Sequence, residues 1–155
     1  MISPEILRRF PFFAYLDERQ LAKIAMITDE DIAKTGVVLF EENQPADTLY
    51  FLIEGGIELY NVSEDKFIPG TRKEFLVGDV NPEEVFAISS LVTPYVLNAM
   101  GRVSKPARFL KIEAIALRKL MDEDCTLGYL ILQQISKALL ERLMYTRVEL
   151  AAARG

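Results

Sequence analysis

The spacing of apolar side chains changes twice along the chain, and each change marks a different kind of secondary structure. Residues 1–31 carry apolar positions at helical spacing, which predicts two short helices. Between residues 32 and 112 the apolar positions come in short runs that Gly, Pro or Asn interrupts, as is typical of strands. Residues 113–152 return to helical spacing. The pattern predicts one α+β domain over residues 1–155, with helices at both ends and strands between them.

Both N-terminal helices have recognisable start signals. Ser3 can cap the first helix, and Pro4 fits the first helical position, where its missing N–H is no loss. Pro11 ends this helix. Asp17 is a suitable cap for a second helix, which we expect to end near Met26.

The middle of the chain favours a small antiparallel β-roll or jelly-roll barrel, because its strands are short and regularly spaced. Gly55-Gly56 predicts a hairpin turn, and Asn43 suits a left-handed turn position. The strands that we expect are residues 32–34, 37–40, 48–53, 57–62, 75–77 and 107–112, with turns or loops at 63–74, 78–79 and 104–106.

Residues 81–101, called here the cassette segment, stand apart from this pattern. We expect a short helix inside the roll at residues 83–91, followed by a strand at 95–100 that Pro94 introduces.

Two helices close the chain, over residues 113–122 and about 124–152, with Asp124 or Thr126 as the cap of the second. The second helix has an apolar face broader than one layer of packing on the roll needs. We therefore expect a homodimer through this helix, between Leu127 and Leu150. The apolar residues of this face are Leu127, Leu130, Ile131, Leu132, Ile135, Ala138, Leu139, Leu140, Leu143, Met144, Val148 and Leu150.

Composition excludes several kinds of chemistry. The 155 residues include no histidine and a single cysteine, Cys125. Ser-His, Cys-His and His-metal sites are therefore excluded, and no disulfide can form within the chain. The net charge of −5 argues against direct nucleic-acid binding. We expect a protein that is not an enzyme.

The location follows from what the N-terminus lacks. Residues 1–16 carry charges and two prolines and contain no uninterrupted apolar stretch, so they do not form a signal peptide. No apolar run is long enough for a transmembrane helix. We expect a cytoplasmic protein without membrane contact, and the single cysteine fits a reducing compartment.

Three stretches resemble the cyclic-nucleotide-binding domain, the effector domain of catabolite-activator-type regulators, regulated kinases and gated channels. They are FPFFAYLDERQLAKIA at residues 10–25, GVVLFEENQPADTLYFLIEGGIELY at 36–60 and FLVGDV at 75–80. The resemblance covers roughly residues 7–143 and implies the β-roll fold and a regulatory role. It also implies that the last helix pairs two subunits. The chain ends after this helix, so we expect no helix-turn-helix domain and no transcription factor.

The cassette segment departs from the family pattern. The family has a Gly-Glu pair at the start of its phosphate-binding helix and a Pro-Arg pair at the end. Here Pro94 matches, but Tyr95 stands in the Arg place. One alignment puts Ala87 in the Gly place, and another puts Glu83 in the Gly place and Glu84 in the Glu place. The resemblance thus implies a degenerate cassette, with Glu83, Glu84, Ala87, Ser89, Ser90 and Tyr95 as candidate ligand-binding residues.

Each candidate has a second interpretation. Tyr95, with Phe86, could plug the vacated pocket or stack on a ligand, and Glu83-Glu84 could be a solvated capping pair. Ser89 and Ser90 could be helix-surface serines or anion donors.

Three functions stay open from the sequence. The first is a regulatory or interaction module without a cofactor, with weak or no cAMP or cGMP binding and a separate effector protein. The second is a genuine cyclic-nucleotide or small-molecule sensor with non-standard contacts, in which Arg72 and Lys73 would replace the missing Arg. The third is a cupin-like enzyme, against which the absence of histidine argues.

Overall fold

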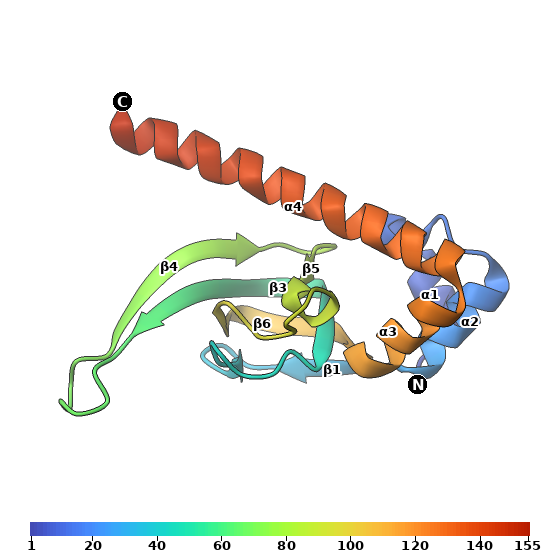
Figure 1. The fold of residues 1–155 in the computed structure, drawn as a ribbon, viewed down its shortest axis with the longest axis horizontal. Coiled ribbons are helices and arrows are strands. Elements are labelled where there is room, and N and C mark those ends of the chain that lie inside the picture. Colours follow the sequence, from blue (N-terminus) through green and yellow to red (C-terminus); the bar gives the residue numbers. More distant parts are fainter.

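A six-stranded antiparallel sheet forms the body of the molecule, and the helices pack around one end of it (Figure 1). The structure is a computed structural model and describes residues 1–155. The predicted α+β architecture, with helices before and after an antiparallel β-roll, is confirmed.

The N-terminal helices begin where their caps predict. In α1 (Pro4–Arg8) the Ser3 hydroxyl accepts a hydrogen bond from the Glu5 N–H at 3.3 Å. A short 3₁₀ turn, η1 (Pro11–Phe13), follows. In α2 (Glu18–Met26) Asp17 and Gln20 form a reciprocal capping box, in which Asp17 accepts from the Gln20 N–H at 2.8 Å.

The sheet consists of two long strands with shorter strands paired to them. Its order is β1-β6-β3-β4, while β2 also pairs with β6 and β5 pairs with β3. All pairs are antiparallel, so the chain winds back and forth through the roll. The strands are β1 (Thr28–Ala33), β2 (Val38–Phe40), β3 (Thr48–Ser63), β4 (Lys73–Val80), β5 (Val85–Phe86) and β6 (Met100–Glu113).

The hairpin predicted at Gly55-Gly56 is wrong, because β3 runs through both glycines as one strand. Its register against β6 shifts at this point, which marks a β-bulge. Gly55 has φ +93°, and a Cβ there would lie 2.3 Å from the Pro106 carbonyl oxygen. The glycines therefore permit two strands to approach closely. The predicted turns at 104–106 and 78–79 are wrong too, since β6 and β4 run through them.

The cassette segment also differs from its prediction. The helix predicted at residues 83–91 is wrong in its first half: Val85 and Phe86 form β5 on β3, and only η2 (Ile88–Leu91) is helical. Both β5 side chains are buried, so tertiary pairing overrides local propensity here. The strand predicted at 95–100 is wrong as well, since β6 begins only at Met100 and Val96 makes an isolated bridge to Pro45.

Two hydrophobic clusters make up the core, and the cassette segment is anchored in both. One cluster joins the helices to the sheet and includes Phe51 and Val85. The other fills the roll and includes Leu52, Phe86 and Phe109. Because successive strand residues face opposite sides, β3 and β5 each contribute to both clusters.

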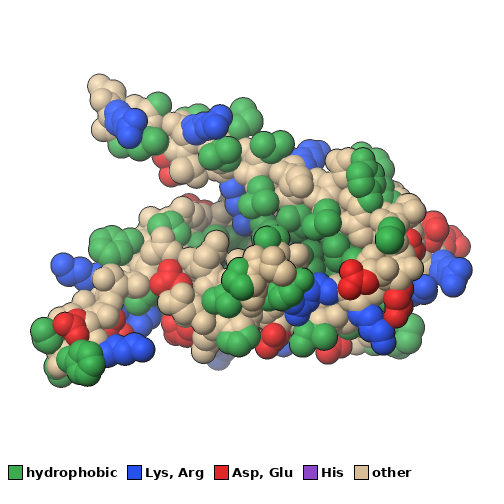
Figure 2. Space-filling model, viewed as in Figure 1, with side chains coloured by type: hydrophobic (Ala, Val, Ile, Leu, Met, Phe, Trp, Pro, Cys, Tyr) green, Lys and Arg blue, Asp and Glu red, His purple; other side chains and the backbone are tan.

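The chain ends with α3 (Ala114–Glu123) and the long α4 (Cys125–Arg154). Asp124 caps α4 by accepting from the Leu127 N–H at 3.1 Å. Leu127, Ile131 and Ile135 are buried in the core. Beyond them α4 runs over the sheet, and its C-terminal end stands clear of the roll (Figures 1 and 2). Hydrophobic side chains remain exposed along this part of the helix. No helix has the length and apolar character that crossing a membrane requires.

Candidate functional site

A cavity of about 240 Å³ lies between the cassette segment and α4. Eight of its eleven lining residues are hydrophobic. Arg142 of α4 is the one charged side chain in its wall, and Ser89 and Asn98 are the two polar ones. The hydrophobic residues are Phe40, Leu59, Ala87, Ile88, Val92, Leu97, Ala99 and Leu139.

The backbone of the cassette segment is fixed in a conformation that L-residues seldom adopt. Glu83, Ala87 and Tyr95 all have positive φ, of 72°, 58° and 58°. The Glu83 N–H donates to the Leu52 carbonyl at 2.7 Å, and the Tyr95 carbonyl accepts from the Ala46 N–H at 2.8 Å. Contacts with the body of the roll therefore maintain these left-handed positions. Ala87 keeps the left-handed backbone although it carries a Cβ.

Arg142 reaches from α4 to the cassette segment. One of its terminal nitrogens donates a hydrogen bond to the Val85 carbonyl. The side chain is half-buried, and this desolvation lowers the pKa of the guanidinium, while the charge of Glu84 acts in the opposite direction. None of the ion pairs in the protein includes Arg142. It is thus a partly desolvated cation with a backbone carbonyl as its partner.

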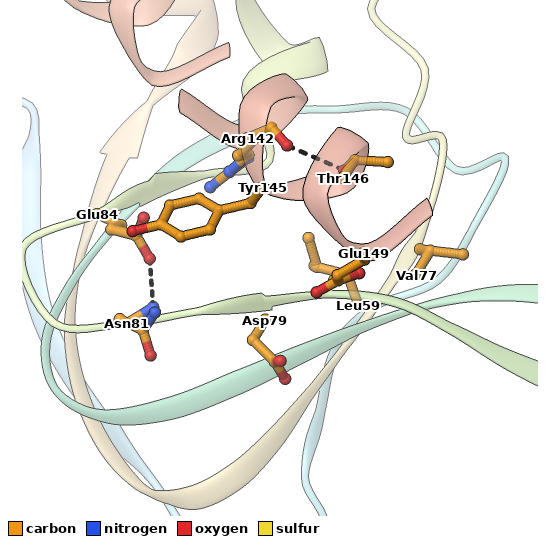
Figure 3. A pocket seen from close by; sticks show the side chains of 10 residues that line it. Leu59, Val77, Asp79, Asn81, Glu84, Arg142, Tyr145, Thr146 and Glu149 are labelled. Atoms are coloured by element: carbon orange, nitrogen blue, oxygen red, sulfur yellow. Dashed lines mark hydrogen bonds between the residues drawn. The ribbon is translucent and has the colours of Figure 1, made fainter. Parts of the chain in front are cut away.

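A second cavity, of about 250 Å³, also has Arg142 in its wall (Figure 3). It shares Leu59 and Arg142 with the first cavity. Three acidic side chains line it: Asp79 from β4, Glu84 from the cassette segment and Glu149 from α4. Arg142 therefore lines both an acidic cavity and a largely apolar one.

The predicted site residues that line a cavity do not all line the same one. Ala87 and Ser89 line the apolar cavity. Glu84 lines the acidic cavity, where its carboxylate accepts from the Asn81 N–H at 2.6 Å. Glu83 lines a third cavity, of about 310 Å³, together with Glu84 and Arg142. The Ser90 side chain is fully buried, and its hydroxyl has no hydrogen-bond partner.

Tyr95 lies outside the apolar cavity. Its ring packs under the Arg118 guanidinium of α3, 3.7 Å from the ring centroid. Phe86 is completely buried and stacks on Tyr50 with ring centroids 4.9 Å apart. Neither side chain is among those that line the cavity.

The cations proposed as replacements from the sequence lie elsewhere. Arg72 pairs with Glu41 and Glu64, each at 3.6 Å. Neither Arg72 nor Lys73 lines the apolar cavity.

Arg142 is not among the site residues predicted from the sequence, because it is 57 residues from its partner Val85. The available signal was a Glu-Arg pair at 141–142 that interrupts the apolar run of α4. No group of three or more Asp, Glu or Cys side chains is arranged to hold a metal ion.

Comparison with known proteins identifies the fold. Residues 32–124 match the family described as the cyclic nucleotide-binding domain. A putative cyclic nucleotide-binding protein from Geobacter metallireducens GS-15 is 38% identical, with a TM-score of 0.81 over 92% of this chain and 99% of that one. No curated protein matches the chain significantly.

Two more distant structures share the fold. The sensor domain of the transcriptional regulator DNR from Pseudomonas aeruginosa is 20% identical, with a TM-score of 0.69 over 90% of this chain and 89% of that one. The regulatory domain of Toxoplasma gondii PKA with cAMP is 16% identical, with a TM-score of 0.66 over 86% of this chain and 48% of that one.

Proposed function

The chain belongs to the cyclic nucleotide-binding domain family, and we propose that it is a non-catalytic regulatory module that binds cyclic AMP and cyclic GMP weakly or not at all. It shares its fold with the sensor domain of the transcriptional regulator DNR, which fits a regulatory role.

The observation that carries the proposal is the absence of a cation contributed by the cassette segment. Tyr95 stands where the family resemblance implies an Arg, and its ring packs against Arg118 instead of facing the cavity. Loss of a charge-assisted contact to a buried phosphate costs about 2–5 kcal/mol. At about 1.4 kcal/mol per tenfold change, a micromolar site becomes roughly millimolar or weaker. The acidic side chains of Glu83 and Glu84 nearby add repulsion toward a phosphate.

A thermal-melt titration with cyclic AMP and cyclic GMP tests this proposal. A nucleotide present at 100 times its dissociation constant would stabilise the fold by about 2.7 kcal/mol. We expect no saturable shift of Tm at micromolar nucleotide. A saturable shift there would show a nucleotide site of ordinary affinity and would overturn the proposal.

A second candidate function is a sensor for another small molecule. The open cavity beside Arg142 favours it, because neither Tyr95 nor Phe86 fills that space. An effector protein that receives the signal fits either function. The cytoplasmic location stays a prediction.

The module is proposed to work as a homodimer through α4. Leu132, Leu139, Leu143 and Leu150 follow one another at intervals of seven, four and seven residues. This spacing suits the seam of a two-stranded coiled coil. Each side chain is 43–48% exposed, so the core of the subunit leaves the seam uncovered.

Light scattering tests the dimer with a matched pair of variants. We expect the double substitution Leu143→Glu and Leu150→Glu to give monomers, because it places like charges in the seam. Val148→Glu is the control. The sequence placed Val148 in the same apolar face, but at about 100° per residue it lies about 160° around α4 from Leu132, so it is outside the seam, and it is 68% exposed. A monomeric wild-type protein at high concentration would remove the dimer from the proposal.

A further inference from the structure

Arg142 has more hydrogen-bonding capacity than the protein satisfies. A guanidinium carries five N–H donors and always bears its charge. The Val85 carbonyl is the one acceptor bonded to the Arg142 guanidinium, and no carboxylate pairs with it. Because half-burial withdraws part of its hydration, an anion placed beside Arg142 would bond donors that have no acceptor within the protein.

Three cavities have Arg142 in their walls, and they differ in what they would accept. Asp79, Glu84 and Glu149 line the acidic cavity, and their charges repel an anion (Figure 3). In the third cavity, Glu83, Glu84 and Glu141 outnumber Lys137, so an anion is disfavoured there too. The apolar cavity has no acidic side chain in its wall. An anion that contacts Arg142 is therefore favoured on the side of the cassette segment, where Ser89 and Asn98 can add neutral hydrogen bonds.

The lining of this cavity also selects the body of the ligand. Phe40, Ile88 and Leu97 belong to a wall that is mostly hydrophobic, so burial favours an apolar body. The volume of about 240 Å³ is below the roughly 300–1,000 Å³ of sites for drug-sized ligands, so the body is compact. The cavity resembles a pocket for a small amphiphile with one charged end.

The charge of the ligand follows from the single cation. A phosphate monoester carries about −1.5 to −2 charges at pH 7 and would leave part of its charge uncompensated by Arg142. A carboxylate and a phosphodiester each carry one charge, so charge alone does not choose between them. The two oxygens of a carboxylate match the planar fork of a guanidinium, and a small carboxylate on an apolar body suits the compact, mostly hydrophobic cavity better than a nucleotide with its polar sugar. Resting on the proposed regulatory function, the geometry points to a small carboxylate with an apolar body as the ligand, held by Arg142 between α4 and the cassette segment.

Binding of defined probes to the full chain tests this inference. Phenylacetate and hexanoate supply a carboxylate on an apolar body, whereas phenylacetamide keeps the shape without the charge and inorganic phosphate supplies charge without the body. Calorimetry and saturation-transfer NMR measure binding of each. We expect saturable binding of a carboxylate probe, with phenylacetamide and phosphate at least about tenfold weaker.

Variants on α4 assign the contact. Arg142→Gln should weaken carboxylate binding about tenfold to a hundredfold, because it removes a charge-assisted bond. Arg142→Lys should give an intermediate loss, since it keeps the charge but not the fork. Arg147→Gln, an exposed arginine on the same helix, should leave binding unchanged.

Three results would overturn the inference. They are no binding of either carboxylate up to about 10 mM, equal binding of phenylacetamide, or unchanged binding by Arg142→Gln. Cyclic AMP is titrated in the same series to separate the two proposals. Micromolar binding of cyclic AMP would contradict the proposed function, whereas absence of both nucleotide and carboxylate binding would overturn the carboxylate inference alone.

Discussion

Replacing Arg142 with methionine should leave the unliganded fold about as stable as it is now. The change keeps a long side chain over the cavity and removes the charge. Full burial of an ion costs several kcal/mol, so desolvation of the half-buried guanidinium destabilises the fold by roughly 2 kcal/mol. The hydrogen bond from Arg142 to the Val85 carbonyl stabilises the fold by about 1.5–3 kcal/mol, because one partner is charged. The two effects nearly cancel, and we expect Arg142→Met to change the free energy of unfolding by less than about 1 kcal/mol.

Urea unfolding followed by circular dichroism measures this difference at one fixed protein concentration, so that dimerisation affects both proteins equally. The slope of the transition should be the same for both, and the midpoint should move little. Arg147→Met is the control for loss of an arginine from the exposed side of α4.

A loss of more than about 3 kcal/mol in Arg142→Met would refute this reasoning. Such a loss would mean that the contact of Arg142 with Val85 holds α4 against the cassette segment and that the main role of Arg142 is structural.

Three further expectations test other parts of the site. The pKa of Asp124 is lowered, chiefly because its carboxylate accepts a hydrogen bond from the Leu127 N–H. The ionised carboxylate therefore stabilises the fold fully above the unfolded pKa of about 3.9. This stabilisation is lost as the pH falls through the lower pKa of the folded state. In thermal melts across pH, Asp124→Asn should therefore be less stable than wild type near neutrality and equal to it in acid; a constant difference would contradict this. Tyr95→Arg should not restore cyclic AMP binding in melts, because position 95 faces Arg118, and it should cost about 0.5–1 kcal/mol of stability. Ala87→Gly should raise stability by about 0.5–1 kcal/mol in urea, since it relieves a left-handed alanine; destabilisation would show that Ala87 is not strained.

Features that depend on neighbouring residues were predictable from the sequence. The caps at Ser3, Asp17 and Asp124 were predicted and are confirmed, because each cap bonds a backbone N–H two or three residues away. Asn43 was predicted in a left-handed turn and has φ 69°. The order of helical and strand regions was predictable from the spacing of apolar residues, because those residues must face the two core clusters.

Features that depend on distant residues were not predictable in the same way. Gly55-Gly56 resembles a hairpin turn locally, but the close approach of β6 at Pro106 makes it a bulge. The pairing of Val85 and Phe86 with β3 likewise replaces a helix that the local sequence favours.

The candidate site was predicted in part. The sequence located the cassette segment, and the structure places Ala87 and Ser89 at the cavity. The charged residue of the cavity comes from α4, and the spacing of residues within the cassette segment contains no information about it. Tyr95 was predicted as a site residue because a tyrosine stands where the family has an arginine. The orientation of its side chain depends on Arg118 of α3, which is distant in the sequence.

Calorimetric titration of the full chain with cyclic AMP measures the central claim most directly. With Tyr95 packed under Arg118, the cassette segment provides no charge for the phosphate, and we expect a dissociation constant of about 1 mM or weaker. A dissociation constant in the low micromolar range would contradict the claim, because it would require a phosphate contact as strong as the one that the missing arginine would make.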